Sequence, residues 1–138
     1  MARKKESLFW DRVKPRLAGL DPVRIECDSA LGVPDVNCTL GWIELKQVQE
    51  KDLPKRATTP LRIPHFTPQQ RAWLARRSHF GGKCWVLILI GKDWLLIEGL
   101  TAATHLGKVT VKETYSRASH VWKDYNPSKD QLQEALRG

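Results

Sequence analysis

The most informative segment of this chain reads Gly32-Val33-Pro34-Asp35-Val36-Asn37-Cys38-Thr39-Leu40-Gly41-Trp42-Ile43-Glu44-Leu45-Lys46. Apolar and polar residues alternate along it from residue 35 to 40 and again from 42 to 46, which is the period of a half-buried β-strand. Leu40-Gly41 lies where a tight turn would fall. The segment therefore predicts a β-hairpin of two adjacent antiparallel strands.

A two-residue loop would fix the register of this hairpin, because opposed residues in an antiparallel pair keep a constant sum of numbers. Asp35 would then oppose Lys46, and Asn37 would oppose Glu44, with all four side chains on one polar face. Asp35 and Glu44 become diagonal neighbours, with about 7–8 Å between their backbone positions, close enough for both carboxylates to bind one cation. The opposite face would pack into the core and carries Val36, Cys38, Leu40, Ile43 and Leu45.

Length and composition indicate one globular domain over residues 1–138, with 41% hydrophobic residues. The formal charge of +8 favours a polyanionic partner such as nucleic acid. The three cysteines show no C-x-x-C spacing, so neither a disulfide framework nor a structural zinc site is indicated. The longest apolar run, Cys84 to Ile90, is too short to span a bilayer, and the basic start lacks a signal-peptide run. We therefore expect a cytoplasmic protein without a membrane partner.

The rest of the chain predicts helices and strands on both sides of the hairpin. Expected helices cover residues 6–17 with a kink at Pro15, 67–78, 101–105, and the end of the chain from about Ser128. Expected strands cover residues 23–27, 84–90, 94–98 and 109–114. The strand at 84–90 is continuously apolar, which is typical of a strand covered on both faces.

Two basic segments are candidates for contact with a nucleic-acid backbone. The loop from Gln47 to Phe66 is long enough to be functional or mobile, so it is either a flap over nucleic acid or a plain surface loop. Its basic residues are Lys51, Lys55, Arg56 and Arg62. The N-terminal arm suits phosphate contact or is a solvated terminus, and it carries Arg3, Lys4 and Lys5.

Thr67-Pro68-Gln69-Gln70 predicts a helix start, with Thr67 as the N-cap and Gln70 at the capping-box position. Gln70 also lies one turn before Trp73 and Leu74, on the face that would pack on the sheet. Two roles therefore stay open for Gln70: it caps its own helix, or it reaches the carboxylates of the hairpin.

Asp35, Glu44 and Lys46 suit the hydrolysis of a phosphodiester. A hard divalent cation held by two carboxylates polarises a phosphate and activates water, and the backbone carbonyl of Leu45 is a candidate third ligand. Lys46 returns to the same strand face, where an ammonium can orient water or offset negative charge on the phosphate. The alternative is an ordinary solvated surface with modest ion pairs.

Pro34-Asp35 followed by Glu44-Leu45-Lys46 resembles the signature of the PD-(D/E)xK nuclease superfamily. The order of the flanking features is similar to the VRR-NUC branch and to the archaeal-type Holliday junction resolvases, in a stand-alone, phage-like form. These features are Gly32-Val33-Pro34-Asp35, Ile43-Glu44-Leu45-Lys46, Thr67-Pro68-Gln69-Gln70-Arg71-Ala72-Trp73-Leu74 and then an apolar strand. The resemblance covers about residues 6–98 and leaves 99–138 as a C-terminal extension.

The resemblance implies an α/β restriction-endonuclease-like fold, with a mixed central sheet flanked by helices. It also implies that Asp35 and Glu44 bind magnesium or manganese, that Lys46 is the catalytic lysine, and that Gln70 belongs to the active site. Glu6 matches an acid on the first helix that completes the metal site, with Glu26 and Asp28 as competitors for that role. Ser29 falls near a serine seen in the resolvases.

The implied function is a metal-dependent endodeoxyribonuclease acting on branched DNA, in the first place a Holliday junction resolvase. Symmetric cutting of two strands would require a twofold homodimer, and the location would be the cytoplasm of a prokaryote or a phage-infected cell. One alternative is a flap, fork or nicking nuclease. Another is a DNA-binding recombination accessory protein that does not cut, against which the intact Asp35, Glu44 and Lys46 argue.

Overall fold

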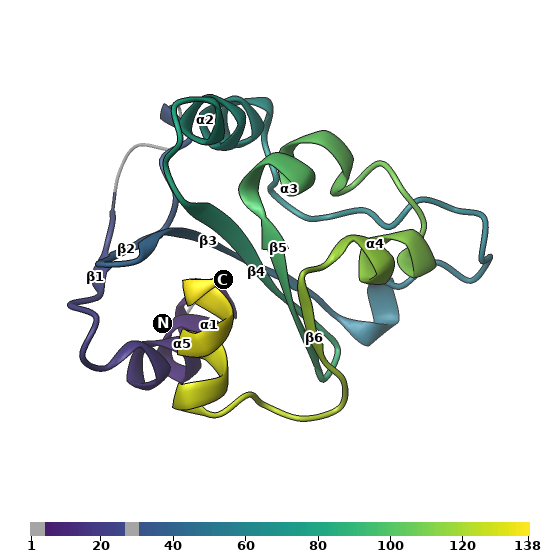
Figure 1. Cartoon of the computed structure of the whole chain (residues 1–138). Helices are drawn as coiled ribbons and strands as arrows, with labels where there is room; N and C mark the ends of the chain where they lie inside the picture. Colours follow the sequence, from purple (N-terminus) through teal and green to yellow (C-terminus); the bar gives the residue numbers. More distant parts are fainter. Residues whose placement is uncertain (1–4, 27–30) are drawn as a thin grey trace.

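The computed structural model describes residues 5–26 and 31–138, leaving out the side chains of residues 5–7. The described chain is α/β, with one six-stranded mixed sheet in the order β1-β2-β3-β4-β5-β6 (Figure 1). The strands are β1 Val23–Arg24, β2 Val36–Cys38, β3 Gly41–Val48, β4 Cys84–Ile90, β5 Asp93–Glu98 and β6 His120–Trp122. Neighbouring strands run antiparallel except β3 and β4, which are parallel.

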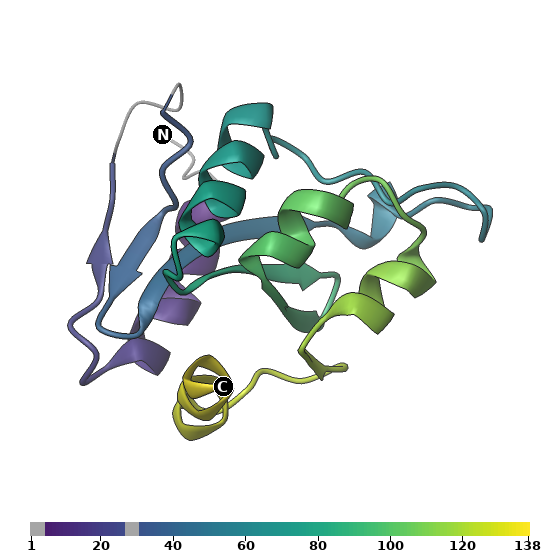
Figure 2. The same cartoon turned by 45° about the horizontal axis from the view of Figure 1, so that its top comes forward.

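Helices cover both faces of this sheet. In Figure 1, α2 and α3 lie above the sheet and α1 and α5 below it, and Figure 2 brings α2 and α3 forward. The helical elements are α1 Lys5–Val13, η1 Lys14–Leu17, η3 Glu50–Asp52, α2 Pro68–His79, α3 Gly99–His105, α4 Val111–Arg117 and α5 Lys129–Arg137. A parallel strand pair needs a crossover connection, and α2 supplies it between β3 and β4.

The side chains of β4 divide between two cores, as strand alternation requires. Trp85, Leu87 and Leu89 pack with α1 and α5, whereas Val86 and Ile88 pack with α2 and α3. Every residue of β4 is buried, so the prediction of a strand covered on both faces is confirmed.

The β2–β3 hairpin forms, but its register differs from the predicted one. The turn lies at Thr39-Leu40, Cys38 pairs with Gly41, and Val36 pairs with Ile43. The expected pairing of Asp35 with Lys46 is therefore wrong: the observed register, extended past β2, places Asp35 across from Glu44. A shift of two residues is a whole strand period, so the assignment of residues to the two faces is preserved.

Gly41 explains the difference between the predicted turn at Leu40-Gly41 and the observed turn at Thr39-Leu40. The glycine is not a turn residue but begins β3 with φ +148°, and a Cβ there would lie 2.4 Å from the carbonyl oxygen of Lys83. The N–H of Trp42 donates to that same oxygen at 3.1 Å. The glycine therefore permits the chain before β4 to approach β3 closely.

Most of the predicted elements are confirmed, with three corrections. The first helix gives way to a 3₁₀ turn containing Pro15, and α2, α5 and the two central strands lie where expected. The strand expected at 109–114 is wrong, because the side chain of Thr110 accepts from the Glu113 N–H at 3.2 Å and starts α4 instead. Strand β6 was not predicted, and β1 ends at Arg24 rather than continuing to Cys27, which lies outside the described residues.

The segment after residue 98 contributes directly to the core. Trp122 of β6 and Leu132 and Leu136 of α5 pack with Phe9 of α1. The side-chain amide of Gln133 donates to two carbonyl oxygens at the end of η1, those of Arg16 at 3.1 Å and Ala18 at 2.9 Å. No helix in the described part of the chain is long and apolar enough to cross a membrane.

Candidate active site

Glu44 and Lys46 lie on the face of β3 that is turned toward α2, and each is only 2% exposed. The predicted alternative of a solvated strand surface is therefore wrong for these two residues. Asp35, in the bend just before β2, keeps 24% of its side chain exposed. The three side chains thus lie together, as the hairpin pattern predicted, but at the edge of a core rather than on open surface.

Asp35 is fixed by backbone as well as by charge. Strand β3 continues past its last pairing with β2, and the side chain of Asp35 accepts the Leu45 N–H with Oδ2 at 2.9 Å. Its other oxygen, Oδ1, lies 3.5 Å from Nη1 of Arg24 on β1. Sequence analysis did not identify Arg24 as a neighbour of Asp35. The strand that carries Arg24 has only two residues, and its sequence does not predict that it pairs with β2. The role of the Leu45 carbonyl as a metal ligand stays a prediction.

Gln70 fulfils both of the roles that the sequence left open. Its Oε1 accepts the Thr67 N–H at 3.1 Å, while its own N–H donates to Thr67 Oγ1 at 3.2 Å, which completes the capping box. Its Nε2 donates to Oε1 of Glu44 at 3.4 Å. An amide has an acceptor and a donor on opposite sides, so the cap orients the NH₂ group toward the carboxylate.

Gly32 allows the strand segment with Asp35 to approach the start of α2. This glycine has φ +68°, and a Cβ on it would lie 2.3 Å from the carbonyl oxygen of Gln69. A larger residue would push apart the two backbones that bring Asp35 and Gln70 to the same site.

The Lys46 ammonium has three neighbours in the site. Its Nζ lies 3.5 Å from Oε1 of Glu44, donates to the main-chain oxygen of His65 at 2.9 Å, and lies 5.7 Å from the ring centroid of Phe66. Sequence analysis missed His65 and Phe66, because the loop that carries them offered only its basic residues as a signal.

The surroundings of Glu44 fit a bound cation. Burial, followed by the neighbouring Asp35 carboxyl, raises the pKa of Glu44 from 4.5 to about 9, and Lys46 opposes this shift only in part. Oε2 of Glu44 is buried and has no hydrogen-bond partner among the described residues. Buried polar atoms without partners are rare in folded proteins, and a cation bound between the two carboxylates would satisfy this one.

The donor set also suits a hard divalent cation such as Mg²⁺ or Mn²⁺, which prefers carboxylate, carbonyl and water oxygens. The described residues contain no group of three or more His, Cys, Asp or Glu side chains able to hold a metal. Two carboxylates would therefore need other oxygen ligands to complete the coordination.

Several predicted site residues are not brought to this centre. Helix α1, which carries Glu6 in its first turn, packs on the opposite face of the sheet, and the side chains of Glu6 and Lys5 are not described. Glu26 is exposed. The assignments that lie outside the described residues are Arg3, Lys4, Asp28 and Ser29. These roles stay predictions.

The basic loop is partly anchored rather than free. Leu61 and Ile63 are buried in the core under α2 and α3, and the Leu61 N–H donates to the Val109 oxygen at 2.8 Å. The four basic residues named above, Lys51, Lys55, Arg56 and Arg62, are all exposed. A cavity of about 400 Å³ beside the loop is lined by Asp52, Arg62, Pro64 and His65.

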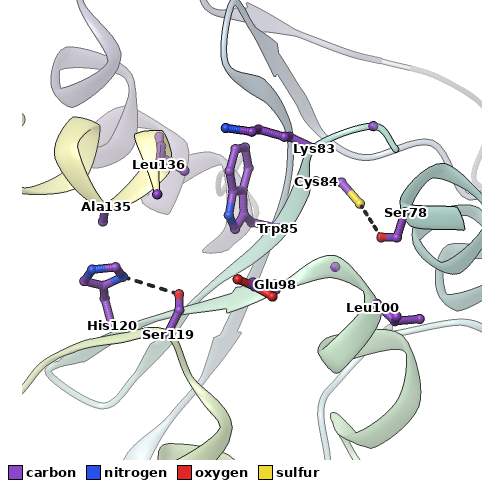
Figure 3. Close-up of a pocket in the computed structure, with 13 residues that line it drawn as sticks. Ser78, Lys83, Cys84, Trp85, Glu98, Leu100, Ser119, His120, Ala135 and Leu136 are labelled. Atoms are coloured by element: carbon purple, nitrogen blue, oxygen red, sulfur yellow. Dashed lines mark hydrogen bonds between the residues drawn. The ribbon is translucent and has the colours of Figure 1, made fainter. Parts of the chain in front are cut away.

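A second cavity, also of about 400 Å³, lies where β4 begins and does not include the carboxylate site. Figure 3 shows Lys83, Trp85, Glu98 and His120 around it. The thiol of Cys84 lies 3.4 Å from Ser78 Oγ, and burial raises the pKa of this thiol, so it is not an activated nucleophile.

Comparison with family models, with curated proteins and with solved structures gave no match to this chain. The case for a function therefore depends on the geometry of Asp35, Glu44, Lys46 and Gln70 in this chain.

Proposed function

We propose that this protein is a metal-dependent endodeoxyribonuclease of the PD-(D/E)xK type, with a restriction-endonuclease-like fold. The observation that carries the proposal is the buried Glu44 next to Asp35: one of its oxygens has no partner among the described residues, and the other contacts Lys46 and Gln70. A buried acid, an adjacent acid and a buried lysine are costly to fold, so their convergence favours a catalytic role over a structural one.

Asp35 and Glu44 would hold Mg²⁺ or Mn²⁺. When bound, such an ion supplies polarisation of the phosphate and a more acidic water. Arg24 and the Leu45 N–H keep the Asp35 carboxylate in place, and Gln70 does the same for Glu44. These contacts pre-organise the two carboxylates before any ligand arrives.

Hydrolysis forms a bond from water oxygen to phosphorus and breaks the bond to the leaving sugar oxygen, so negative charge increases on the phosphate oxygens. Lys46 supplies a fixed cation next to that centre, where the low local polarity makes its charge effective. Gln70 and Lys46 both contact Oε1 of Glu44, which leaves Oε2 without a hydrogen-bond partner among the described residues.

The proposed substrate is branched DNA, in the first place a four-way junction. The net charge of +8 and the exposed basic residues on the loop after η3 support binding to a phosphate backbone. Symmetric cleavage of a junction would use two copies of the chain related by a twofold axis.

The test is a cleavage assay with labelled four-way junction, flap, fork and duplex DNA, each with Mg²⁺ or with chelator. Paired symmetric nicks in the junction support a resolvase, and cleavage of only the flap or fork replaces it with the structure-specific alternative. Asp35→Asn and Glu44→Gln should abolish cleavage but not folding, whereas Glu134→Gln, an exposed carboxylate change on α5, should cleave normally. Binding without cleavage on every substrate would support the accessory-protein alternative and contradict the enzyme.

A further inference from the structure

The Lys46 ammonium is held by main chain as well as by charge. Two of its neighbours, Glu44 and the His65 carbonyl, can accept hydrogen bonds from the ammonium, and only Glu44 can carry a negative charge. The carboxylate of Glu44 is also a candidate metal ligand, whereas the His65 oxygen is a neutral acceptor at the shorter distance, 2.9 Å against 3.5 Å.

The direction of the His65 carbonyl depends on an uncommon backbone conformation. His65 has φ +61°, in the left-handed region that few residues other than glycine adopt, although asparagine, aspartate and histidine are enriched there. Such a conformation costs free energy and persists where its surroundings enforce it, which is common at functional sites.

The chain on both sides of His65 is fixed. Before it, Leu61 and Ile63 are buried in the core. After it, the Phe66 ring contacts both Lys46 and Arg71, with the Arg71 guanidinium 4.3 Å from the ring centroid, and Thr67 caps α2. The turn from Pro64 to Phe66 is therefore held in a defined conformation, in which the His65 carbonyl points at the Lys46 ammonium.

We propose that His65 is a positioning residue, whose left-handed conformation keeps the Lys46 ammonium in the active site while Glu44 binds a cation. A cation bound at Glu44 would repel the Lys46 ammonium, because like charges a few ångströms apart disfavour each other strongly at low polarity. The His65 oxygen keeps its dipole in either state and so retains the ammonium. The inference depends on the proposed metal-dependent function.

The experiment compares two groups of His65 variants. His65→Gly and His65→Asn tolerate positive φ and keep the carbonyl in place, whereas His65→Val does not, because a β-branched residue is strained there. We expect the first two to cleave at close to the wild-type kcat, and His65→Val to lose about 10- to 100-fold in kcat. Any change in the KM for DNA should be similar in all three variants, since each of them replaces the imidazole side chain.

A second measurement does not depend on cleavage. In protein labelled with ¹⁵N-lysine, the NH₃⁺ signal that disappears in Lys46→Ala belongs to Lys46. It should persist in His65→Gly with and without Mg²⁺, and should broaden through solvent exchange in His65→Val, most of all with Mg²⁺. Asp21→Val is the matched control, because Asp21 is exposed, has φ +51° and lies outside the site, so it imposes the same strain without moving Lys46.

The outcomes separate the two proposals. A wild-type protein that cleaves nothing contradicts the proposed function, while the lysine signal still reports on the turn. The positioning role is wrong if His65→Val keeps both kcat and the Lys46 signal, if His65→Gly loses as much kcat as His65→Val, or if Asp21→Val has the same effect on kcat.

Discussion

At the centre of β3, from Ile43 to Lys46, both faces are buried, and they differ there in chemistry. Ile43 and Leu45 are 0% exposed and fill the core with α1, whereas Glu44 and Lys46, the residues between and after them, are 2% exposed on the side of α2. The first face stabilises the fold by removing apolar surface from water. The second places two ionisable groups in a setting that disfavours their charges. Both sides of the sheet contain a hydrophobic core, but the buried ionisable pair lies only on the α2 side of these four residues.

The largest expected effect comes from neutralising the polar face. The double variant Glu44→Gln with Lys46→Met should lose at least about 100-fold in cleavage, because it removes a candidate ligand and a charge-stabilising cation. Its free energy of unfolding should stay the same or rise, by up to about 4 kcal/mol, because buried ion pairs often cost more to desolvate than they return. Chemical denaturation and the junction assay measure the two quantities. A double variant that is much less stable would show that the pair is structural.

The apolar face should respond in the opposite way. Ile43→Ala should cost about 2–5 kcal/mol of unfolding free energy, because truncating a fully buried isoleucine leaves a cavity. The fraction that remains folded should cleave at the wild-type rate. Leu100→Ala, at a leucine that is 55% exposed, is the control and should change stability by less than about 0.5 kcal/mol.

The pH dependence of stability should distinguish the faces as well. The pKa of Glu44 is about 9 in the folded protein and near 4.5 when unfolded, so the folded state binds the extra proton between these values. Stability without metal should therefore be greatest below pH 4.5 as far as Glu44 is concerned, and should fall as the pH rises toward 9, by at most about 1.4 kcal/mol per pH unit. Thermal melts of the wild type and Glu44→Gln across this range measure the difference. Equal pH profiles would contradict the raised pKa.

Gln70 links the polar face to α2, and two substitutions should separate its roles. Thr67→Ala removes a cap hydrogen bond and should cost about 1 kcal/mol with little change in cleavage. Gln70→Ala should cost a similar amount of stability but should also lower kcat, by about tenfold, because the Glu44 carboxylate loses its orienting donor. If both variants cleave equally, Gln70 acts only as a helix cap.

Local patterns in the sequence were sufficient to predict much of this arrangement. Alternation in the hairpin assigned Asp35, Glu44 and Lys46 to one face, and the spacing of Thr67 and Gln70 predicted the start of α2. These features are encoded by neighbours in the chain. The continuous apolar run of β4 likewise predicted its complete burial.

Features set by distant parts of the chain could not be predicted in the same way. The observed hairpin register differs from the predicted one by two residues, because Gly41 is needed for the close approach of the Lys83 carbonyl rather than for the turn. Lys83 lies far along the chain from Gly41. The burial of Glu44 and Lys46, the approach of Arg24 to Asp35 and the carbonyl of His65 all depend on packing between elements. The pattern at 109–114 offered β-branched residues as a strand signal, and the capping hydroxyl of Thr110 prevailed.

Gln70 both caps α2 and donates to Glu44. Fraying of the first turn of α2 is therefore thermodynamically linked to the order of the proposed metal ligand Glu44. When the first turn of α2 unwinds, Glu44 loses its amide donor, so any ligand that requires an ordered Glu44 must bind the wound form preferentially. Amide hydrogen exchange at the N–H of Gln70, which is held by Thr67 Oγ1, should therefore slow when Mg²⁺ is added. Hydrogen exchange in the first turn of α2 would then report on metal binding, although no residue of this turn is a proposed metal ligand.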